Sequence, residues 1–463
     1  MAQANEELQV LDSSHVSPPP GSVRTTSLRL TFFDLPWFGF PNIQRLFFYE
    51  FPYPTLYFMD TILPLLKHSL SLTLQHFFPY AAKLMCPPPP GKPYLHYEDG
   101  DFVTFTVVES SADFNHVIAH YPRDVKLLRP FAPRLPTAPV AEDGTRVLPV
   151  IAFQVTLFPN SGICIGSNYC HVVGDGKTFM HFIRSWSSVH RADGGDLSCL
   201  EKSLPSWNKD VIKDPDGTES LHLKIYWNWV ATNNENSGQT HVAAADKVRA
   251  TFLLGRAHVE KLKDLVTAAN SEQLHVSTFV VTCAFIWVCL IKSQESFTRN
   301  SSDADDNKFY YFQFPFDCRN RLEFPIPETY LGNCLKPGIA EVKKSELIGE
   351  NGILLAAKAI GNKVKETENR GLRDVESWIT TIMERTRSGR FVSVSGSPKL
   401  YVYDINFGWG RPRKVELVHI DSNETISLAE CRDEQGGIEI GLALNKKPMD
   451  EFSAIFEQSL KLL

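Results

Sequence analysis

The sequence predicts a mixed α/β protein whose chain divides into two halves of similar size. Its 463 residues exceed what one hydrophobic core usually serves, so two domains are expected. In both halves, apolar runs with strand character alternate with segments of helical periodicity. Between the halves, residues 192–245 turn polar and irregular, which is typical of a crossover linker. We therefore predict an N-terminal domain over residues 1–191 and a C-terminal domain over residues 246–463.

The first half begins with a mostly polar lead-in over residues 1–24. The elements expected after it are a strand over 28–34, a helix over most of 57–78, short strands over 94–97 and 102–108, a strand over 147–158, a hairpin turn at 159–162 and a buried strand over 162–170. Pro64 lies inside the helical segment, so it marks either a helix start or a kink.

The second half repeats this alternation. The expected elements are a strand over 247–254, an amphipathic helix over 258–269, a buried helix over 278–292, strands over 310–316, 399–407 and 438–444, and a closing helix over 449–463. The acidic residues within 301–308 are expected to form a solvated loop and not a binding site. The most apolar run, residues 278–291, is shorter than a membrane span and suits a buried helix.

The composition is that of an ordered globular protein. Hydrophobic residues make up 43% of the chain and aromatic residues 11%. The formal charge of −6, without a dense basic run, argues against a nucleic-acid partner. The nine cysteines show neither CxxC nor metal-finger spacing and HExxH is absent, so we expect no metal. The amino terminus lacks a signal pattern, and we predict a cytosolic protein with reduced thiols.

A histidine stands where the buried strand 162–170 gives way to a glycine-rich turn. His171 precedes Asp175 by four residues, glycines flank the aspartate, and apolar residues then recur at helical spacing. Such a turn lets a substrate reach the imidazole, because no bulky side chains crowd it. The alternative is a structural histidine at a strand end, since a chain with 14 histidines can produce HxxxD by chance. A nucleophilic Cys170 is disfavoured because neighbours on a strand point to opposite faces.

A second motif lies near the carboxyl end of the chain. It consists of Asn406, Phe407, Gly408, Trp409 and Gly410. Taken alone, this motif would be a structural turn that packs aromatic side chains. Together with His171-Val-Val-Gly-Asp175-Gly, it resembles the plant BAHD family of acyl-CoA-dependent acyltransferases, which carries HxxxDG near mid-chain and DFGWG near the C-terminus. The resemblance covers essentially the whole chain. Tyr330-Leu-Gly-Asn-Cys334 is similar to the Tyr-Phe-Gly-Asn-Cys signature of the branch that acylates flavonoid and anthocyanin glycosides.

The resemblance implies two chloramphenicol-acetyltransferase-like domains with His171 in a channel between them. Acyl-CoA is then a co-substrate, and no cofactor is bound. A neutral imidazole takes the proton of a sugar hydroxyl as its oxygen attacks the thioester, and returns that proton to the leaving thiolate. Asp175 is expected to hold the turn that orients the histidine. The resemblance points to Ser395, Ser397 or Trp409 as donors to the oxyanion.

The asparagine at position 406 departs from the aspartate of the family motif. The resemblance implies that this aspartate pairs with the arginine of Asp-Cys-Arg, here Arg319. Asn406 keeps an acceptor oxygen but loses the charge, and Asp404 is the candidate replacement because it lies two residues earlier on the same predicted strand face. We predict that Asn406 does not abolish activity. Any penalty should fall on stability, through a less compensated Arg319.

The residues that select the substrates are less sharply defined. Arg184, in the helix after His171, is a candidate partner for a malonyl carboxylate, and the alternative is a surface helix charge. The acceptor candidates are Phe33, Asp34 and Trp37, where the alternatives are core packing for the aromatic rings and a turn position for the aspartate.

The function predicted from these features is acyl transfer. We expect a monomeric, acyl-CoA-dependent O-acyltransferase that moves a hydroxycinnamoyl group (p-coumaroyl or caffeoyl) or a malonyl group to a sugar hydroxyl of an anthocyanin or flavonoid glucoside. Two alternatives stay open. One is a phenolic-glucoside malonyltransferase, and the other is a non-catalytic ligand-binding member of the same fold.

Overall fold

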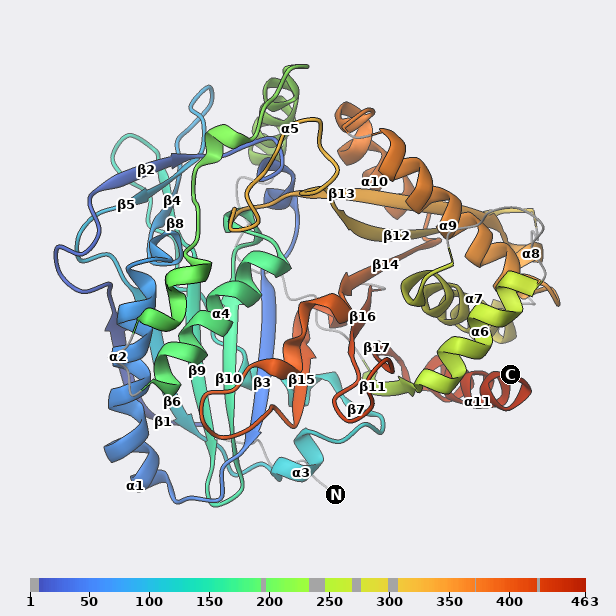
Figure 1. Cartoon of the computed structure of the whole chain (residues 1–463), viewed down its shortest axis with the longest axis horizontal. Coiled ribbons are helices and arrows are strands. Elements are labelled where there is room, and N and C mark those ends of the chain that lie inside the picture. Colours follow the sequence, from blue (N-terminus) through green and yellow to red (C-terminus); the bar gives the residue numbers. More distant parts are fainter. Residues whose placement is uncertain are drawn as a thin grey trace.

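The computed structural model describes residues 8–192, 197–232, 246–268, 276–298, 307–370, 372–422 and 425–463. Two large sheets stand side by side, each with helices packed against it, and a small sheet borders the first of them (Figure 1). The mixed α/β class predicted from the sequence is confirmed.

A six-stranded sheet carries the strand that leads to His171. Its strands, in spatial order, are β1 (Gln9–Val16), β6 (Val103–Glu109), β9 (Ile151–Phe158), β10 (Gly162–Tyr169), β3 (Ile43–Glu50) and β15 (Lys414–Leu417). β6 and β9 run parallel, and the other neighbouring pairs run antiparallel. β9 and β10 form the predicted hairpin and are buried along their whole length. This burial on both faces explains why most of their residues are apolar. The polar side chains of Gln154, Thr156, Ser167 and Asn168 are buried with them.

Helices cover one face of this sheet. α4 (Gly176–Arg191) follows His171 as predicted and packs beside α2 (Leu63–Leu74). α2 has Pro64 in its first turn, where a proline replaces an N–H that would lack a partner. The preceding turns are α1 (Thr55–Tyr57) and a π-helical turn, and α3 (Phe114–Val117) belongs to a separate apolar cluster.

A seven-stranded sheet forms the core of the second half. Its strands, in spatial order, are β13 (Leu335–Lys343), β12 (Phe309–Asp317), β14 (Phe391–Gly396), β16 (Thr425–Glu430), β17 (Ile438–Asn445), β11 (Lys247–Leu254) and β7 (Arg123–Asp124). The helices of this half are α6 (Arg256–Ala268), α7 (Thr278–Thr298), α8 (Lys344–Ile348), α9 (Gly352–Arg370), α10 (Trp378–Arg387) and α11 (Lys446–Leu462). Figure 1 shows α6, α7 and α9 gathered on the far side of this sheet from α4.

The helix α7 is longer than the sequence predicts. By length and composition its residues 278–295 would suffice to cross a membrane, and this is the one such window in the described part of the chain. However, 72% of that window is buried inside the protein. α7 packs against α9, α11 and α6, so it has the environment of a core helix.

The small sheet and α5 complete the fold. The small sheet contains β2 (Thr26–Arg29), β5 (Tyr94–Tyr97), β4 (Lys83–Cys86) and β8 (Arg146–Pro149). α5 (Thr218–Thr232) lies within the predicted crossover. The described part of this crossover is therefore ordered around a helix and short 3-10 turns, although its sequence suggested an irregular linker.

Each large sheet borrows a strand from the other half of the chain. β15, from the C-terminal half, pairs with β3, and β7, from the N-terminal half, pairs with β11. A parallel bridge between Ser206 and Tyr330 also ties the crossover to the C-terminal half. The two halves are thus joined by backbone hydrogen bonds at several places, which fixes the position of any site between the sheets.

Two predicted strands are wrong in part or in whole. The segment 399–407 forms two 3-10 turns, η10 (Pro398–Leu400) and η11 (Val402–Asp404), because Tyr401 between them adopts a left-handed conformation with φ of 48°. A strand cannot continue through that residue. The predicted strand 28–34 ends at Arg29, and the following residues fold inward.

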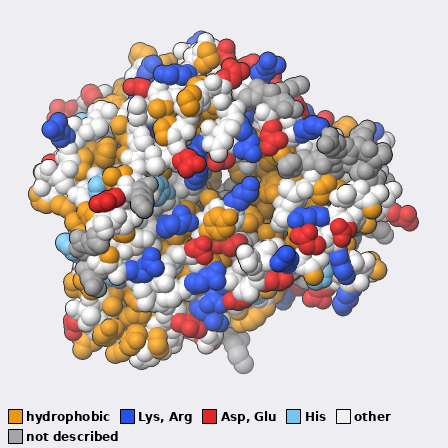
Figure 2. Space-filling model, viewed as in Figure 1, with side chains coloured by type: hydrophobic (Ala, Val, Ile, Leu, Met, Phe, Trp, Pro, Cys, Tyr) orange, Lys and Arg blue, Asp and Glu red, His pale blue; other side chains and the backbone are white. Residues whose placement is uncertain are grey.

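The surface is mixed in character. Figure 2 shows Lys and Arg side chains interspersed with Asp and Glu, in keeping with the small net charge of −6. Hydrophobic side chains gather at the lower left of this view, over α1, where Tyr53, Leu56 and Tyr57 are exposed.

Candidate active site

His171 lies at the point where β10 ends and α4 begins. The chain makes a 3-10 turn, η6 (His171–Val173), and Asp175 then caps α4 by accepting a hydrogen bond from the Thr178 N–H at 3.1 Å. Gly174 is required between them, because a Cβ at this position would lie 2.5 Å from Thr178 Cγ2. The strand, the turn and the capped helix therefore fix the backbone on both sides of the histidine.

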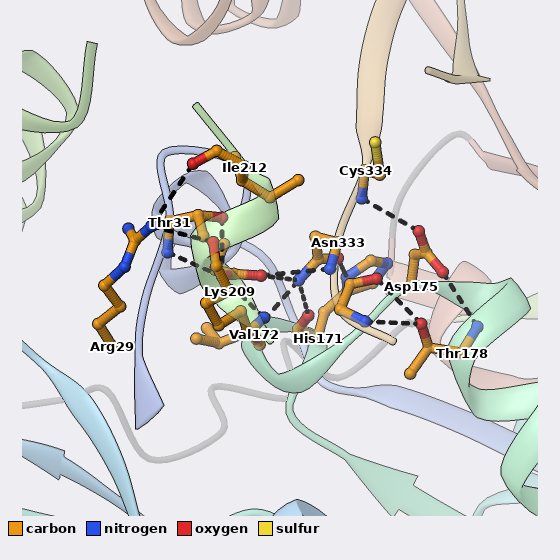
Figure 3. A network of polar contacts seen from close by, with 12 residues as sticks. Arg29, Thr31, His171, Val172, Asp175, Thr178, Lys209, Ile212, Asn333 and Cys334 are labelled. Carbon is orange, nitrogen blue, oxygen red and sulfur yellow. Dashed lines mark hydrogen bonds and ion pairs between the residues drawn. The ribbon is translucent and has the colours of Figure 1, made fainter. Parts of the chain in front are cut away.

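The imidazole of His171 is held by an asparagine from the other half of the chain (Figure 3). Asn333 Oδ1 lies 3.1 Å from His171 Nδ1. The Asn333 Nδ2 atom has three acceptors around it, namely the carbonyls of His171 at 2.9 Å and Val172 at 3.2 Å and the carboxylate of Asp34 at 3.0 Å. An atom surrounded by acceptors must be the amide nitrogen, so the oxygen faces the histidine.

This amide orientation determines the tautomer of His171. Because Asn333 Oδ1 can only accept, His171 Nδ1 must carry the proton and donate it. Nε2 then carries the lone pair, and no described residue donates to it or accepts from it. A neutral imidazole with Nε2 unprotonated has the form that a general base needs.

The surroundings of His171 keep it neutral. The side chain is 8% exposed, and Trp37 stacks on its ring with centroids 3.6 Å apart and an interplanar angle of 13°. Burial lowers the pKa of His171 to about 4, while Asp175, Asn333 and Asp34 act in the opposite direction. The ring is therefore unprotonated throughout the neutral pH range.

Asp175 is occupied by structural partners. Its carboxylate forms an ion pair with Arg319 at 2.8 Å and accepts from the N–H groups of Thr178 and Cys334. Burial alone would raise the pKa of Asp175, but the Arg319 guanidinium and these hydrogen bonds hold it below its usual range. This geometry accords with the predicted structural role, because no hydrogen bond joins Asp175 to the imidazole among the described residues.

The expected pairing of Arg319 with position 406 is wrong. Arg319 contacts Asp175, Asp317 and the Gly332 carbonyl, because the end of β12 lies against the start of α4. Asn406 instead accepts from the N–H groups of Gly408 at 2.7 Å and Gly410 at 3.1 Å within its own loop.

The predicted replacement by Asp404 is also wrong. Asp404 lies in η11 and not on a strand, and it is exposed. Its ion-pair partner is Arg411, at 3.8 Å. The charge at Arg319 is therefore balanced without either residue of the 404–406 segment.

The aromatic residues of the second motif belong to the core. Phe407 is 1% exposed and packs edge-on against Trp186 and Tyr49. Trp409 stacks on Phe407 and also meets Tyr49, Phe51 and His190. Among the described residues, the ring contacts of Trp409 all lie within this aromatic cluster and none involves His171. Trp409 therefore has a packing role.

The other donor candidates contact neighbours other than His171. Ser395 Oγ lies 3.4 Å from His419 Nε2, and Ser397 caps η10 by accepting from the Lys399 N–H. Arg184 Nη2 donates to the Leu400 carbonyl at 3.2 Å. The oxyanion donor and the carboxylate role of Arg184 remain predictions.

Of the acceptor candidates, one lies at the histidine. Trp37 is half-buried and covers one face of the imidazole. Phe33 is 1% exposed and packs in the core of the second half against Phe32 and Trp378. The prediction that Phe33 contacts an acceptor is therefore wrong. Asp34 is fully buried and is also unable to reach an acceptor. Both corrections follow from the inward fold of the chain after Arg29.

Three further residues support the site, although no pattern in the sequence assigns them a role there. Asn333 positions the imidazole, Lys209 forms an ion pair with Asp34 at 3.1 Å, and Thr178 Oγ1 joins α4 to Gly332 through two hydrogen bonds. Asn333 belongs to the signature at 330–334, which the sequence uses only to recognise a family branch. Lys209 has no such signal, because its partner lies 175 positions away.

No group of three metal-ligating side chains occurs in the part of the chain that the structure describes. The hydrogen bond to Asn333 and the burial of His171 support proton transfer by an oriented, neutral imidazole.

Comparison with known proteins relates the chain to named acyltransferases. A family model described as the Transferase family matches residues 7–459. Coumaroyl-CoA:anthocyanidin 3-O-glucoside-6''-O-coumaroyltransferase 1 of Arabidopsis thaliana is 43% identical, covering 98% of this chain and 97% of its own. Malonyl-coenzyme A:anthocyanin 3-O-glucoside-6''-O-malonyltransferase of Dahlia pinnata is 37% identical, covering 98% of each. The crystal structure of vinorine synthase superposes with a TM-score of 0.67 at 17% identity, covering 96% of both chains.

Proposed function

The chain belongs to the BAHD family of acyl-CoA-dependent acyltransferases, and we propose that it transfers a hydroxycinnamoyl group from CoA to a sugar hydroxyl of an anthocyanin or flavonoid glucoside. The predicted family, fold class and enzyme class are confirmed. One structural observation carries the proposal for this site. It is the buried neutral His171, whose Nδ1 is committed to Asn333 and whose Nε2 is left as a base.

The reaction uses Nε2 of His171 twice. First, the sugar hydroxyl gives its proton to Nε2 while its oxygen forms a bond to the thioester carbonyl carbon. The tetrahedral intermediate then breaks its carbon–sulfur bond. The CoA thiolate leaves and takes the proton back from Nε2, so the enzyme ends the cycle unchanged. Asn333 accepts the hydrogen bond from Nδ1 throughout and keeps the ring in one orientation.

Two observations support the proposal of a hydroxycinnamoyl donor. Relatives named as coumaroyltransferases are 43% and 42% identical to this chain, whereas the Dahlia malonyltransferase is 37% identical. Arg184, the candidate for a malonyl carboxylate, has a backbone carbonyl as a hydrogen-bond partner. Both observations favour a hydroxycinnamoyl donor. The alternative, a phenolic-glucoside malonyltransferase, is represented among relatives at 37% identity and is tested in the same assay.

We propose a cytosolic monomer in which acyl-CoA serves as a co-substrate and not as a bound cofactor. Six cysteines are buried free thiols, which favours a reducing compartment; they are Cys86, Cys164, Cys283, Cys289, Cys318 and Cys334. Asn333 and Trp37, which contact the imidazole of His171, belong to the same chain as the histidine.

The experiment that tests the function measures thiol release by the purified protein. Cyanidin 3-glucoside is the acceptor, and p-coumaroyl-CoA and malonyl-CoA are offered separately and in competition. We expect acceptor-dependent thiol release with preference for p-coumaroyl-CoA, and a product acylated on the sugar by mass spectrometry. A preference for malonyl-CoA would show that the donor is malonyl-CoA and not a hydroxycinnamoyl-CoA. Absence of acceptor-dependent release with either donor would favour the non-catalytic ligand-binding alternative.

A further inference from the structure

Lys209, in the crossover segment 192–245, is buried beside the residues that surround His171. Lys209 is 4% exposed, and its ammonium forms an ion pair with Asp34, which is fully buried. Removing both charges from water is unfavourable unless their geometry and partners compensate. The ammonium also lies 5.6 Å from the ring of Tyr330, and a Cβ on Gly332 would lie 2.5 Å from Lys209 Nζ. The site is thus built closely around this side chain.

The backbone on both sides of Lys209 is anchored. The preceding Ser206 exchanges hydrogen bonds with the signature segment, donating to the Thr329 carbonyl and accepting from the Leu331 N–H. Arg29 of β2 donates to the carbonyl of Lys209 itself at 2.9 Å. Lys209 begins a short 3-10 turn, η8 (Lys209–Val211), capped by Asn208. The crossover therefore presents Lys209 to Asp34 in one fixed position.

Asp34 connects Lys209 to the asparagine that holds the histidine. One carboxylate oxygen, Oδ2, accepts from Lys209 Nζ and from the N–H and hydroxyl of Thr31. The other, Oδ1, accepts from the Asn333 N–H at 3.2 Å and from Asn333 Nδ2 at 3.0 Å. The lysine, the Thr31 N–H and both Asn333 groups are obligate donors, so only a group that accepts at both ends satisfies this position.

We propose that Lys209 and Asp34 form a positioning pair that sets the tautomer of His171 by holding the Asn333 amide in one orientation. The pair touches neither substrate nor the reacting atoms and acts through Asn333. The proposal rests on the function assigned above, because the tautomer matters only if Nε2 acts as the base. It also gives the crossover a role in catalysis beyond joining the two halves.

The variant Asp34→Asn tests the pair most directly. Donors surround both oxygens of the Asp34 carboxylate. One end of an asparagine side chain is an NH2 group, so in the variant this NH2 group must face donors at one of the two ends. Where it faces Asn333, only the His171 and Val172 carbonyls still accept from Asn333 Nδ2. The amide of Asn333 then turns in a fraction of the molecules, and in these Nε2 of His171 is protonated. We expect kcat to fall by roughly 10- to 100-fold with KM nearly unchanged, because part of the general-base contribution is lost. A kcat within about twofold of wild type would contradict the proposal.

The double variant Asp34→Asn/Lys209→Met separates positioning from loss of stability. Removing the ammonium leaves one obligate donor, the Thr31 N–H, at that end of the side chain, against two donors from Asn333 at the other end. The NH2 of the introduced amide therefore faces Thr31, and its oxygen again accepts from Asn333. We expect the double variant to regain several-fold in kcat over Asp34→Asn. A merely structural pair predicts no such rescue, so a double variant that is no more active than the single one would overturn the inference.

Lys209→Met provides a second measurement that does not need Asp34→Asn to fold. The Asp34 carboxylate raises the pKa of His171. Lys209 places a positive charge next to this carboxylate, and a nearby cation lowers the pKa of a histidine. Without Lys209 we expect the acidic limb of the kcat profile to move to higher pH by about one unit. An unmoved limb would contradict the pairing. Charged or titratable groups around this unit are Asp175, Arg319, Tyr330, Cys334 and His419.

The ring nitrogens of His171 give a readout that is independent of activity. In histidine-labelled protein, with His171 assigned by comparison with His171→Gln, we expect the wild-type 15N shifts to show protonated Nδ1 and those of Asp34→Asn to show a mixture with protonated Nε2. If wild type lacks transferase activity but shows this tautomer change, the function fails while the positioning pair stands. Unchanged shifts in Asp34→Asn would overturn the pair.

A matched control is available in the second half. Lys344 is 2% exposed and pairs with Glu295 of α7, away from the histidine. We expect Lys344→Met to lower stability like any loss of a buried ion pair, but to leave kcat, the acidic limb and the His171 shifts unchanged. If Lys344→Met caused changes of the same size, the effects of the Lys209 and Asp34 variants would be due to general destabilisation.

Discussion

The two motifs of this protein differ in what their polar residues do. His171 faces an asparagine that fixes its tautomer, whereas Asn406 serves its own loop. The aspartate of the first motif, Asp175, holds Arg319 and the start of α4. At the scale of the residue, the chemistry is therefore concentrated in one side chain, and the remaining motif residues maintain the backbone around it.

Replacing Asn406 tests the role assigned to the second motif. Asn406→Asp keeps an acceptor for the Gly408 and Gly410 N–H groups, so we expect kcat within about threefold of wild type. Asn406→Ala loses that acceptor and should lower the free energy of unfolding by about 1 kcal/mol. Steady-state kinetics and urea denaturation measure the two effects. A gain in kcat of orders of magnitude in Asn406→Asp would show that the missing charge limits catalysis.

At the scale of the element, the strand–turn–helix unit around His171 could be predicted from the sequence. β9, β10 and α4 each show a periodicity that matches their burial, and the turn between β10 and α4 is marked by glycines. The segment 399–407 could not be predicted in this way. Its alternating aromatics imitate a strand, but the left-handed Tyr401 divides it into turns, and packing against α4 and β3 decides its shape.

Contacts between distant elements were beyond the reach of sequence patterns. Asn333 and His171 are 162 positions apart, and the borrowed strands β15 and β7 have only four and two residues. Such short strands carry too little periodicity to be distinguished from loops. The strand and the helix on either side of His171 could therefore be predicted, whereas the contact of its imidazole with Asn333 could not.

The two borrowed strands meet at a buried cluster of charges. Glu416 of β15 pairs with Arg123 of β7 at 2.9 Å and with Arg249 of β11 at 2.7 Å, and all three side chains are less than 5% exposed. Burial alone would raise the pKa of Glu416, but Arg249 and its neighbours lower it to about 2. The charges thus depend on one another across the two halves.

Glu416→Gln tests this connection between the sheets. The substitution leaves the buried guanidinium of Arg123 without a carboxylate partner, while Arg249 keeps Asp421, so we expect a loss of about 3–5 kcal/mol in the free energy of unfolding. Glu341→Gln serves as the control, since Glu341 pairs with Arg385 at the surface and should change stability by less than about 1 kcal/mol. Urea denaturation compares the two. Equal effects would show that the cluster does not hold the halves together.

At the scale of the whole molecule, buried neutral histidines link stability to pH. The pKa of His171 falls from 6.5 to about 4 on burial, and that of His222, which is 1% exposed, is also lowered by burial. The unfolded chain binds more protons than the folded one between these pKa values, so stability falls as pH drops below 6.5.

The lowered pKa of His171 predicts how much folding stability the protein loses at acidic pH. At pH 5, His171 alone should lower the free energy of unfolding by about 2 kcal/mol relative to pH 7.5. Urea denaturation at the two pH values measures the loss. His171→Gln removes the titrating group, so it should show a smaller dependence on pH. The same slope in this variant would place the sensitivity elsewhere.

The most direct test of the central claim is the rate of acceptor-dependent CoA release by wild type and His171→Ala. The assay uses p-coumaroyl-CoA and cyanidin 3-glucoside, with CoA affinity measured on both proteins to verify an intact site. Because the alanine removes the base and leaves the surrounding fold, we expect kcat to fall by about 100- to 10,000-fold while CoA affinity is retained. A His171→Ala protein that turns over within tenfold of wild type would contradict the assignment of His171 as the catalytic base.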